Sequence, residues 1–173
     1  YSVTFRGYVS ATATDTSLMD VTGAGCELAG FKLLGTAGTS ATGTINAGFL
    51  RLGTASTGTA HQTHVHDVVV ENTQAAAAGG TSVLVAFDGD VAGGIVGCRF
   101  DDCWIGDFSW APTYCVETGA GTAGPTRTVF NNTTFVIDAQ ATTDRFVNWG
   151  TGATEHTIFE NCRFINVEAG TAP

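Results

Sequence analysis

The sequence has little positive charge. Its 173 residues include 7 Lys and Arg residues against 16 Asp and Glu, Lys32 is the one lysine, and the formal net charge is −9 at pH 7. An acidic chain repels nucleic-acid phosphates and anionic lipid headgroups. We therefore expect neither nucleic acid nor a membrane as a partner, and we attribute the acidity to solubility rather than to a specific function.

Long apolar runs and helical periodicity are also missing. No run approaches the ~18 residues of a membrane-spanning segment. No longer stretch repeats apolar side chains at the three-, four- and seven-residue spacing of a helix. Hydrophobic residues still make up 43% of the chain, which excludes a disordered protein and fits one domain.

Several signatures of catalytic and nucleotide-binding sites are absent. The sequence contains no GxxxxGK[ST], HExxH or GxSxG motif, so we expect no enzymatic activity, no cofactor and no metal. The sequence starts at Tyr1 rather than Met. A fragment, a processed form and the ordered part of a longer protein are the open explanations.

A short pattern recurs five times: an apolar residue, a Gly, Asn or Asp two positions later, and a second apolar residue three positions after that. Phe159, Asn161 and Phe164 fill it in TIFENCRFIN. Gly, Asn and Asp tolerate positive φ, where other side chains clash with the backbone. We therefore predict left-handed bends between short strands at Gly30, Asp67, Gly97, Asn132 and Asn161.

Successive bends lie 29 to 37 residues apart, a spacing typical of stacked repeats. A second turn position follows each bend by five residues, at Gly35, Asn72, Asp102, Ile137 and Asn166. A second series of apolar segments runs in parallel, at 47–53, 82–87, 114–117 and 145–149. Strands in coils of this length, with corners on Gly, Asn and Asp, predict an all-β parallel solenoid.

The units ENCRF, GCRFDD and FNNTTF resemble the repeats of the right-handed parallel β-helix superfamily, the pectate-lyase-like solenoids, over residues 26–167. In that group an Asn often occupies the bend between the second and third sheets. The resemblance implies a short right-handed parallel β-helix of about five to six coils. We assign it to residues 26–173, with residues 1–25 as an N-terminal cap or partial first coil.

The five cysteines are odd in number and form no CxxC pair, so we interpret them as small buried side chains. We assign Cys98 and Cys162 to equivalent positions two coils apart, roughly 10 Å, which is too far for a disulfide. A Cys98–Cys103 pair across the turn is the alternative.

The stretch HQTHVH places His64 and His66 on one face of a strand, near His61, with Val65 pointing inward. This spacing fits a Zn²⁺ or Ni²⁺ site. The sequence offers no clear further ligand in register, so we expect exposed strand histidines and no bound metal.

Five carboxylates fall close together in residues 88–107. Polysaccharide-cleaving β-helices use paired carboxylates as acid and base, whereas the FDGD stretch and Asp102 at a predicted corner indicate turns. We favour turn roles, and the absence of an EF-hand pattern disfavours a calcium site. The carboxylates are Asp88, Asp90, Asp101, Asp102 and Asp107.

The segment DDCWIGDFSWAPTY concentrates the aromatic residues Trp104, Phe108, Trp110 and Tyr114. Such side chains pack over a solenoid, anchor a protein partner or stack on sugars. We predict a contribution to packing or to a partner or subunit contact, with a glycan as the third option.

A Thr-, Gly- and Ala-rich composition, a solenoid without a convincing active site and the truncated look of both termini favour a structural role. We expect a non-catalytic virion surface, decoration or tail-spike/fibre protein of a tailed phage. It would form a homo-oligomer, with a trimer favoured, and contact other virion proteins. A β-helix polysaccharide lyase or glycosidase, or a fragment of one, is the alternative. A bacterial surface adhesin module, extracellular or on the cell surface, is the further one.

Overall fold

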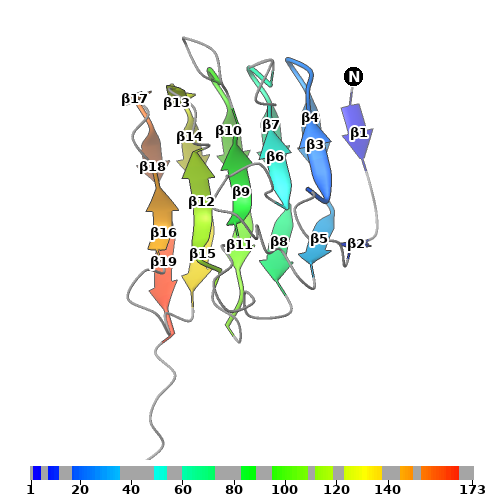
Figure 1. Ribbon diagram of the computed structural model, residues 1–173, viewed down its shortest axis with the longest axis vertical. Helices are drawn as coiled ribbons and strands as arrows, with labels where there is room; N and C mark the ends of the chain where they lie inside the picture. Colours follow the sequence, from blue (N-terminus) through cyan, green and yellow to red (C-terminus); the bar gives the residue numbers. More distant parts are fainter. Residues whose placement is uncertain are drawn as a thin grey trace, which may run out of the picture.

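The computed structural model describes residues 2–4, 8–11, 17–35, 49–53, 60–72, 83–88, 95–108, 112–118, 123–137, 145–149 and 153–167. Strands β1 to β19 and no helix occur among these residues. The strands pair in parallel into three long sheets, and each coil contributes one strand to a sheet. In Figure 1 the coils lie side by side, from the blue N-terminal coil to the red C-terminal coil. The chain is therefore a parallel β-helix, as the sequence predicts, and the right-handed winding stays a prediction.

Each long sheet is named here by its strands. Sheet A contains β1 (Ser2–Thr4), β4 (Glu27–Ala29), β7 (His64–His66), β10 (Arg99–Asp101), β14 (Val129–Asn131) and β18 (Ile158–Glu160). Sheet B contains β2 (Tyr8–Ala11), β5 (Lys32–Gly35), β8 (Val69–Asn72), β11 (Trp104–Gly106), β15 (Thr134–Ile137) and β19 (Arg163–Asn166). Sheet C contains β3 (Met19–Val21), β6 (Leu50–Leu52), β9 (Val83–Phe87), β12 (Tyr114–Thr118) and β16 (Arg145–Asn148).

These sheets confirm two predictions. Their six, six and five strands correspond to the expected number of coils. Four of the five strands of sheet C, namely β6, β9, β12 and β16, coincide with the second series of apolar segments, and β3 was not predicted. A further pair of strands, β13 (Ala123–Thr126) and β17 (Ala153–Glu155), joins the last two coils ahead of sheet A.

Two columns of left-handed backbone flank the strands of sheet A, with φ between 49° and 75°. The column before sheet A consists of Gly25, Gln62, Gly97, Arg127 and His156. The column between sheets A and B consists of Gly30, Asp67, Asp102, Asn132 and Asn161. Hydrogen bonds to the next coil hold these corners: the Asn132 N–H donates to the Glu160 carbonyl at 2.9 Å, and the Gln62 N–H to the Val96 carbonyl at 2.8 Å.

One predicted bend is left-handed, as expected, but lies in the other column. Gly97 belongs to the column before sheet A, and Asp102, predicted at the second turn position, forms the bend between sheets A and B. Both corners are left-handed and lie five residues apart, and in this coil the corner before sheet A is a glycine. Ile95, Gly97 and Phe100 therefore match the apolar–turn–apolar spacing of the predicted bends, although Gly97 is the corner before sheet A rather than the corner between sheets A and B. The other four bends are confirmed.

With this correction the coils align without gaps over five segments, which we call the A–B units. Each contains both corners and the strands of sheets A and B at the same offsets. The A–B units are residues 25–35, 62–72, 97–107, 127–137 and 156–166. The segments that join them differ in length and carry the sheet-C strands β6, β9, β12 and β16. These joining segments are residues 36–61, 73–96, 108–126 and 138–155.

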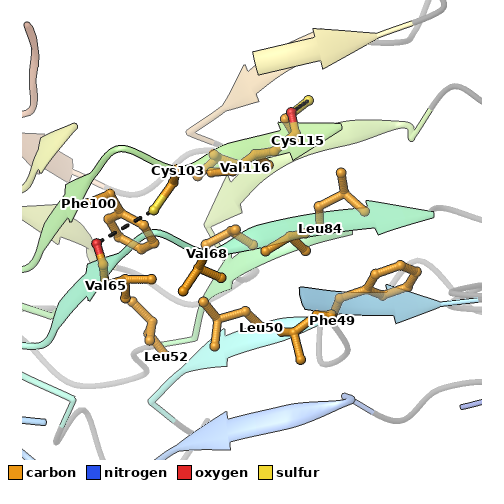
Figure 2. Close-up of a cluster of buried hydrophobic side chains, with 14 of the residues drawn as sticks. Phe49, Leu50, Leu52, Val65, Val68, Leu84, Phe100, Cys103, Cys115 and Val116 are labelled. Carbon is orange, nitrogen blue, oxygen red and sulfur yellow. Dashed lines mark hydrogen bonds between the residues drawn. The ribbon is translucent and has the colours of Figure 1, made fainter. Parts of the chain in front are cut away.

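Inward-pointing side chains from the three sheets form one continuous core. On sheet A, Phe130 is fully buried and stacks on Phe100 of the previous coil and Phe159 of the next, with ring centroids 4.7 and 5.1 Å apart. Stacked rings of this kind contribute about 0.5–1.5 kcal/mol beyond the burial of their area. Figure 2 shows side chains of sheets A and C meeting inside the coil, with Phe100 and Val65 facing Leu50 and Leu52.

Small side chains after the corners connect the coils from inside. The Cys103 thiol donates to the Val65 carbonyl at 3.6 Å (Figure 2), and the Cys162 thiol donates to the Phe130 carbonyl at 3.3 Å. All five cysteines are free, which confirms the small buried role for Cys98, Cys103 and Cys115 and excludes the Cys98–Cys103 disulfide. The equivalence of Cys98 with Cys162 is wrong, because the aligned units pair Cys98 with Cys26 and Cys162 with Cys103.

Candidate functional site

The outer face of sheet A carries a polar cluster built from three neighbouring coils. Side chains alternate along a strand, so the buried Val65 leaves His64 and His66 on the outer face, as predicted. Parallel pairing places one residue from each coil in a row. The two rows are Glu27, His64 and Arg99, and Ala29, His66 and Asp101.

His66 lies between two carboxylates. Its Nε2 is 3.1 Å from Glu27 Oε1, and its Nδ1 is 2.9 Å from Asp67 Oδ2. Hydrogen bonds from the imidazole to the carboxylate of Asp67 and then to that of Glu27 raise the pKa of His66. Because Asp67 is the left-handed corner that follows β7, the backbone bend itself brings this carboxylate back to the ring.

His64 contacts the next coil instead. Its Nε2 is 2.7 Å from Asp101 Oδ2, and its ring centroid lies 4.7 Å from that of His66. Asp101 also accepts hydrogen bonds from Arg99 Nε at 2.5 Å and Asn131 Nδ2 at 2.9 Å. Burial acts to raise the pKa of Asp101, but the three hydrogen bonds together outweigh it and lower the pKa. Asp101 is therefore an ionised, fixed anchor for His64.

Sequence reasoning found the two histidines but missed Glu27. Glu27 lies on the preceding coil, and its place beside His64 depends on the register between β4 and β7. The signal becomes visible only when the A–B units are aligned from corner to corner, because Glu27 and His64 then occupy the same position.

The carboxylates proposed as an alternative acid–base pair have separate roles. Asp102 is a left-handed corner, with φ of 54°, and accepts a hydrogen bond from Asn132 Nδ2 of the next coil. Asp88 is buried, with Oδ2 3.5 Å from Arg51 Nη1. The predicted turn role of Asp102 is thus confirmed, at the corner between sheets A and B. Asp90 lies outside the described residues.

The predicted aromatic contact residues divide between two sheets. Trp104 on β11 and Phe108 lie with ring centroids 5.3 Å apart, and Trp104 Nε1 donates to the Gly106 carbonyl at 2.9 Å. Phe108 is 52% exposed. Tyr114 starts β12 of sheet C, and Trp110 lies outside the described residues. The structure thus brings Trp104 and Phe108 together, and the contact role of all four stays a prediction.

The last coil exposes apolar side chains that sequence reasoning did not single out. Phe164 is 47% exposed, although its partner Phe135 on the preceding coil is fully buried, and Ile158 is 45% exposed on the outer face of sheet A. Phe164 stacks on Phe135 at 5.0 Å, which continues the core rings to the last described coil. Ile158 also lines a hollow of about 350 Å³ with Arg127, Val129 and His156. We call the exposed Phe164 and Ile158 of this last described coil the apolar end face.

Among the described residues, no helix is both long and apolar enough to cross a membrane. Comparisons of this chain with protein-family models, with curated proteins and with solved structures found no match.

Proposed function

We propose that this chain is a structural, non-catalytic module of a tailed-phage virion surface, as a decoration protein or part of a tail spike or fibre. It would assemble as a homo-oligomer, with a trimer favoured, and contact other virion proteins. Its place in the pectate-lyase-like right-handed β-helix superfamily belongs to the same proposal.

The apolar end face is the observation that carries this proposal. Phe164 ends the core stack on the last described coil and is exposed there, and Ile158 of the same coil is exposed on the outer face of sheet A. The strands β18 and β19 have a partner on one side only among the described residues. Edge strands and apolar patches of this kind favour association with further polypeptide. In a trimer, three end faces would meet around the symmetry axis.

The arrangement of the polar residues supports a structural role. Asp101 and Asp102 each take part in contacts between coils, through Asn131 and Asn132 of the following coil. Carboxylates used in this way fix the stacking of one coil on the next. The role is consistent with a shaft whose stiffness comes from repeated contacts between neighbouring coils.

Size-exclusion chromatography with light scattering tests the assembly. We expect the wild-type chain to have the mass of three chains, and Phe164→Glu to dissociate it, because a charge on the apolar end face cannot be buried without a partner. The matched variant Phe108→Glu adds the same charge to the exposed aromatic side chain near β11. If only this second variant dissociates the oligomer, the contact lies on the aromatic segment.

Particle association and activity complete the test. Mass spectrometry of gradient-purified phage particles from the source culture should detect peptides of this chain. Capsular polysaccharides incubated with the chain should keep their length on a sizing column. A stable monomer that shortens polysaccharide would overturn the structural proposal in favour of the lyase or glycosidase.

A further inference from the structure

We propose that Glu27, His64 and His66 form a binding site for one divalent transition-metal ion of the Zn²⁺ class on the outer face of sheet A. Each of the three side chains offers a ligand atom, and these atoms all lie within 4.8 Å of one another. The further ligand that the HVH motif lacks in sequence is supplied by the preceding coil. The site is a product of stacking and goes beyond the structural role proposed above.

The distances fit a single ion. Glu27 Oε1 and His66 Nε2 are 3.1 Å apart, close to the ~3.3 Å that separates two ligands around a tetrahedral zinc with bonds of about 2.0–2.1 Å. The third ligand comes from His64, whose ring centroid lies 4.7 Å from that of His66. An ion between these groups would need only side-chain rotations, because His64 and His66 are 42% and 26% exposed.

The surrounding carboxylates orient both rings as metal ligands. Asp67 binds Nδ1 of His66, which leaves Nε2 directed at Glu27. Asp101 binds Nε2 of His64, which assigns Nδ1 of that ring to the ion. A metal-binding imidazole usually donates its other N–H to a carboxylate or carbonyl, which fixes the tautomer and increases the basicity of the ligand. Here both histidines have such a partner before any ion binds.

The frame that holds the ligands is rigid. Glu27 and His64 are paired residues of adjacent strands, and the intervening inward positions, Leu28 and Val65, are buried in the core. Asp101, which orients His64, is held in turn by Arg99 and Asn131. Ligands on strands of a packed scaffold keep their geometry better than ligands on loops.

The donor set decides the class of ion. Two imidazole nitrogens and one carboxylate suit Zn²⁺, Ni²⁺, Co²⁺ and Cu²⁺, whereas Ca²⁺ and Mg²⁺ require oxygen ligands. Three protein ligands leave at least one coordination position for water or for a group from outside the chain. Glu27, Asp67 and Asp101 also provide the negative charge that attracts a cation to this face.

Isothermal titration of the untagged, chelator-treated chain with ZnCl₂ tests the site. We expect one saturable ion per chain and a higher melting temperature with Zn²⁺ than without it, because binding to the folded state alone stabilises that state. Titration with CoCl₂ should give the visible absorption bands of a low-symmetry Co²⁺ site. CaCl₂ should produce neither effect.

Variants separate ligands from positioning residues. His66→Gln and Glu27→Gln should each weaken Zn²⁺ binding by at least about tenfold and abolish the thermal shift. Asp67→Asn keeps a residue that tolerates the left-handed corner and should weaken binding roughly 10- to 100-fold while the Co²⁺ spectrum changes. His156→Asn removes an exposed histidine from another corner and should leave binding unchanged.

Two results would overturn the proposal. One is a wild-type chain that binds no Zn²⁺ in a saturable manner and shows no change in melting temperature. The other is binding that survives both His66→Gln and Glu27→Gln in variants whose circular dichroism matches that of the wild type. Because each altered side chain lies on the outer face, we expect these variants to fold.

Discussion

The A–B units and the segments that join them differ in how strictly their length is controlled. Every A–B unit has the same offsets from corner to corner and from corner to strand, while segments 36–61, 73–96, 108–126 and 138–155 differ in length. A one-residue insertion inside a strand of a unit would exchange its outward and inward faces, because side chains alternate. An insertion in a joining segment leaves sheets A and B unchanged.

This difference separates two tasks within one coil. The A–B units keep residues from successive coils in register, which is what places Glu27, His64 and Asp101 together. The joining segments, which carry strands of sheet C, accommodate the variation in coil length, and loops generally tolerate such variation. If the A–B units also contribute most of the free energy of unfolding, substitutions in them should destabilise the fold more than substitutions in sheet C.

The largest effect is expected for the ring stack of sheet A. Phe130→Ala removes a fully buried ring that contacts Phe100 and Phe159, and should lower the free energy of unfolding by about 3–5 kcal/mol. Val147→Ala, at a half-buried position of sheet C, should cost only about 1 kcal/mol. Urea unfolding followed by circular dichroism measures both. Equal losses would contradict a special role for the A–B units.

A glycine in sheet B should be almost as sensitive. Gly106 has a φ of 126°, and a Cβ there would lie 1.9 Å from the Val136 carbonyl oxygen of the next coil. Gly106→Ala should therefore cost roughly 3 kcal/mol or more, since backbone must move. Gly30→Ala has space around its Cβ and should cost only about 1–2 kcal/mol for the left-handed backbone. Thermal unfolding of the two variants gives the comparison.

The sheet-C side should carry a pH dependence. Burial raises the pKa of Glu117 to about 7 from an ordinary value of 4.5, although Asn148 Nδ2 donates to its Oε1 at 2.8 Å. A carboxyl with a raised pKa stabilises the fold fully below its unfolded pKa and loses that contribution as pH rises through 7. Stability should therefore fall by about 2–3 kcal/mol between pH 4.5 and pH 8.

The control for this prediction is a pair of isosteric variants. Glu117→Gln should flatten the pH dependence and be more stable than the wild type at pH 8, as measured by urea unfolding at each pH. Glu160→Gln, on the exposed face of β18, should follow the wild-type profile. A wild-type stability that rises steadily from pH 5 to pH 8 would refute the assignment to Glu117.

The smallest effect is expected at Thr128 and Thr133, each of which directly follows a left-handed corner. Thr133 Oγ1 donates to the Asn131 carbonyl at 3.2 Å, whereas buried Thr128 Oγ1 has no hydrogen-bond partner among the described residues. Thr133→Val should cost about 1 kcal/mol, and Thr128→Val should be neutral or stabilising by up to about 1 kcal/mol. Opposite signs in differential scanning calorimetry would support this difference, and equal losses would contradict it.

Much of the fold is predictable from the sequence, because Gly, Asn and Asp mark the corner between sheets A and B. The column before sheet A was missed because Gln62, Arg127 and His156 are residue types that rarely adopt left-handed backbone. Their φ values depend on contacts with neighbouring coils. Because the two columns were not distinguished, the bend between sheets A and B was predicted at Gly97 instead of Asp102. For the candidate site, the outward His64 and His66 followed from strand alternation, while Glu27 required the register between coils.

Thiol chemistry distinguishes the five cysteines. Burial raises the pKa of Cys98 to about 11 and of Cys103 to about 12, and it raises that of Cys115 as well. Maleimide reagents at neutral pH should consequently modify the partly exposed Cys26 and Cys162 first. Dyes on these two sites, one near each end of the described stack, would turn the protein into a molecular ruler for bending and stretching.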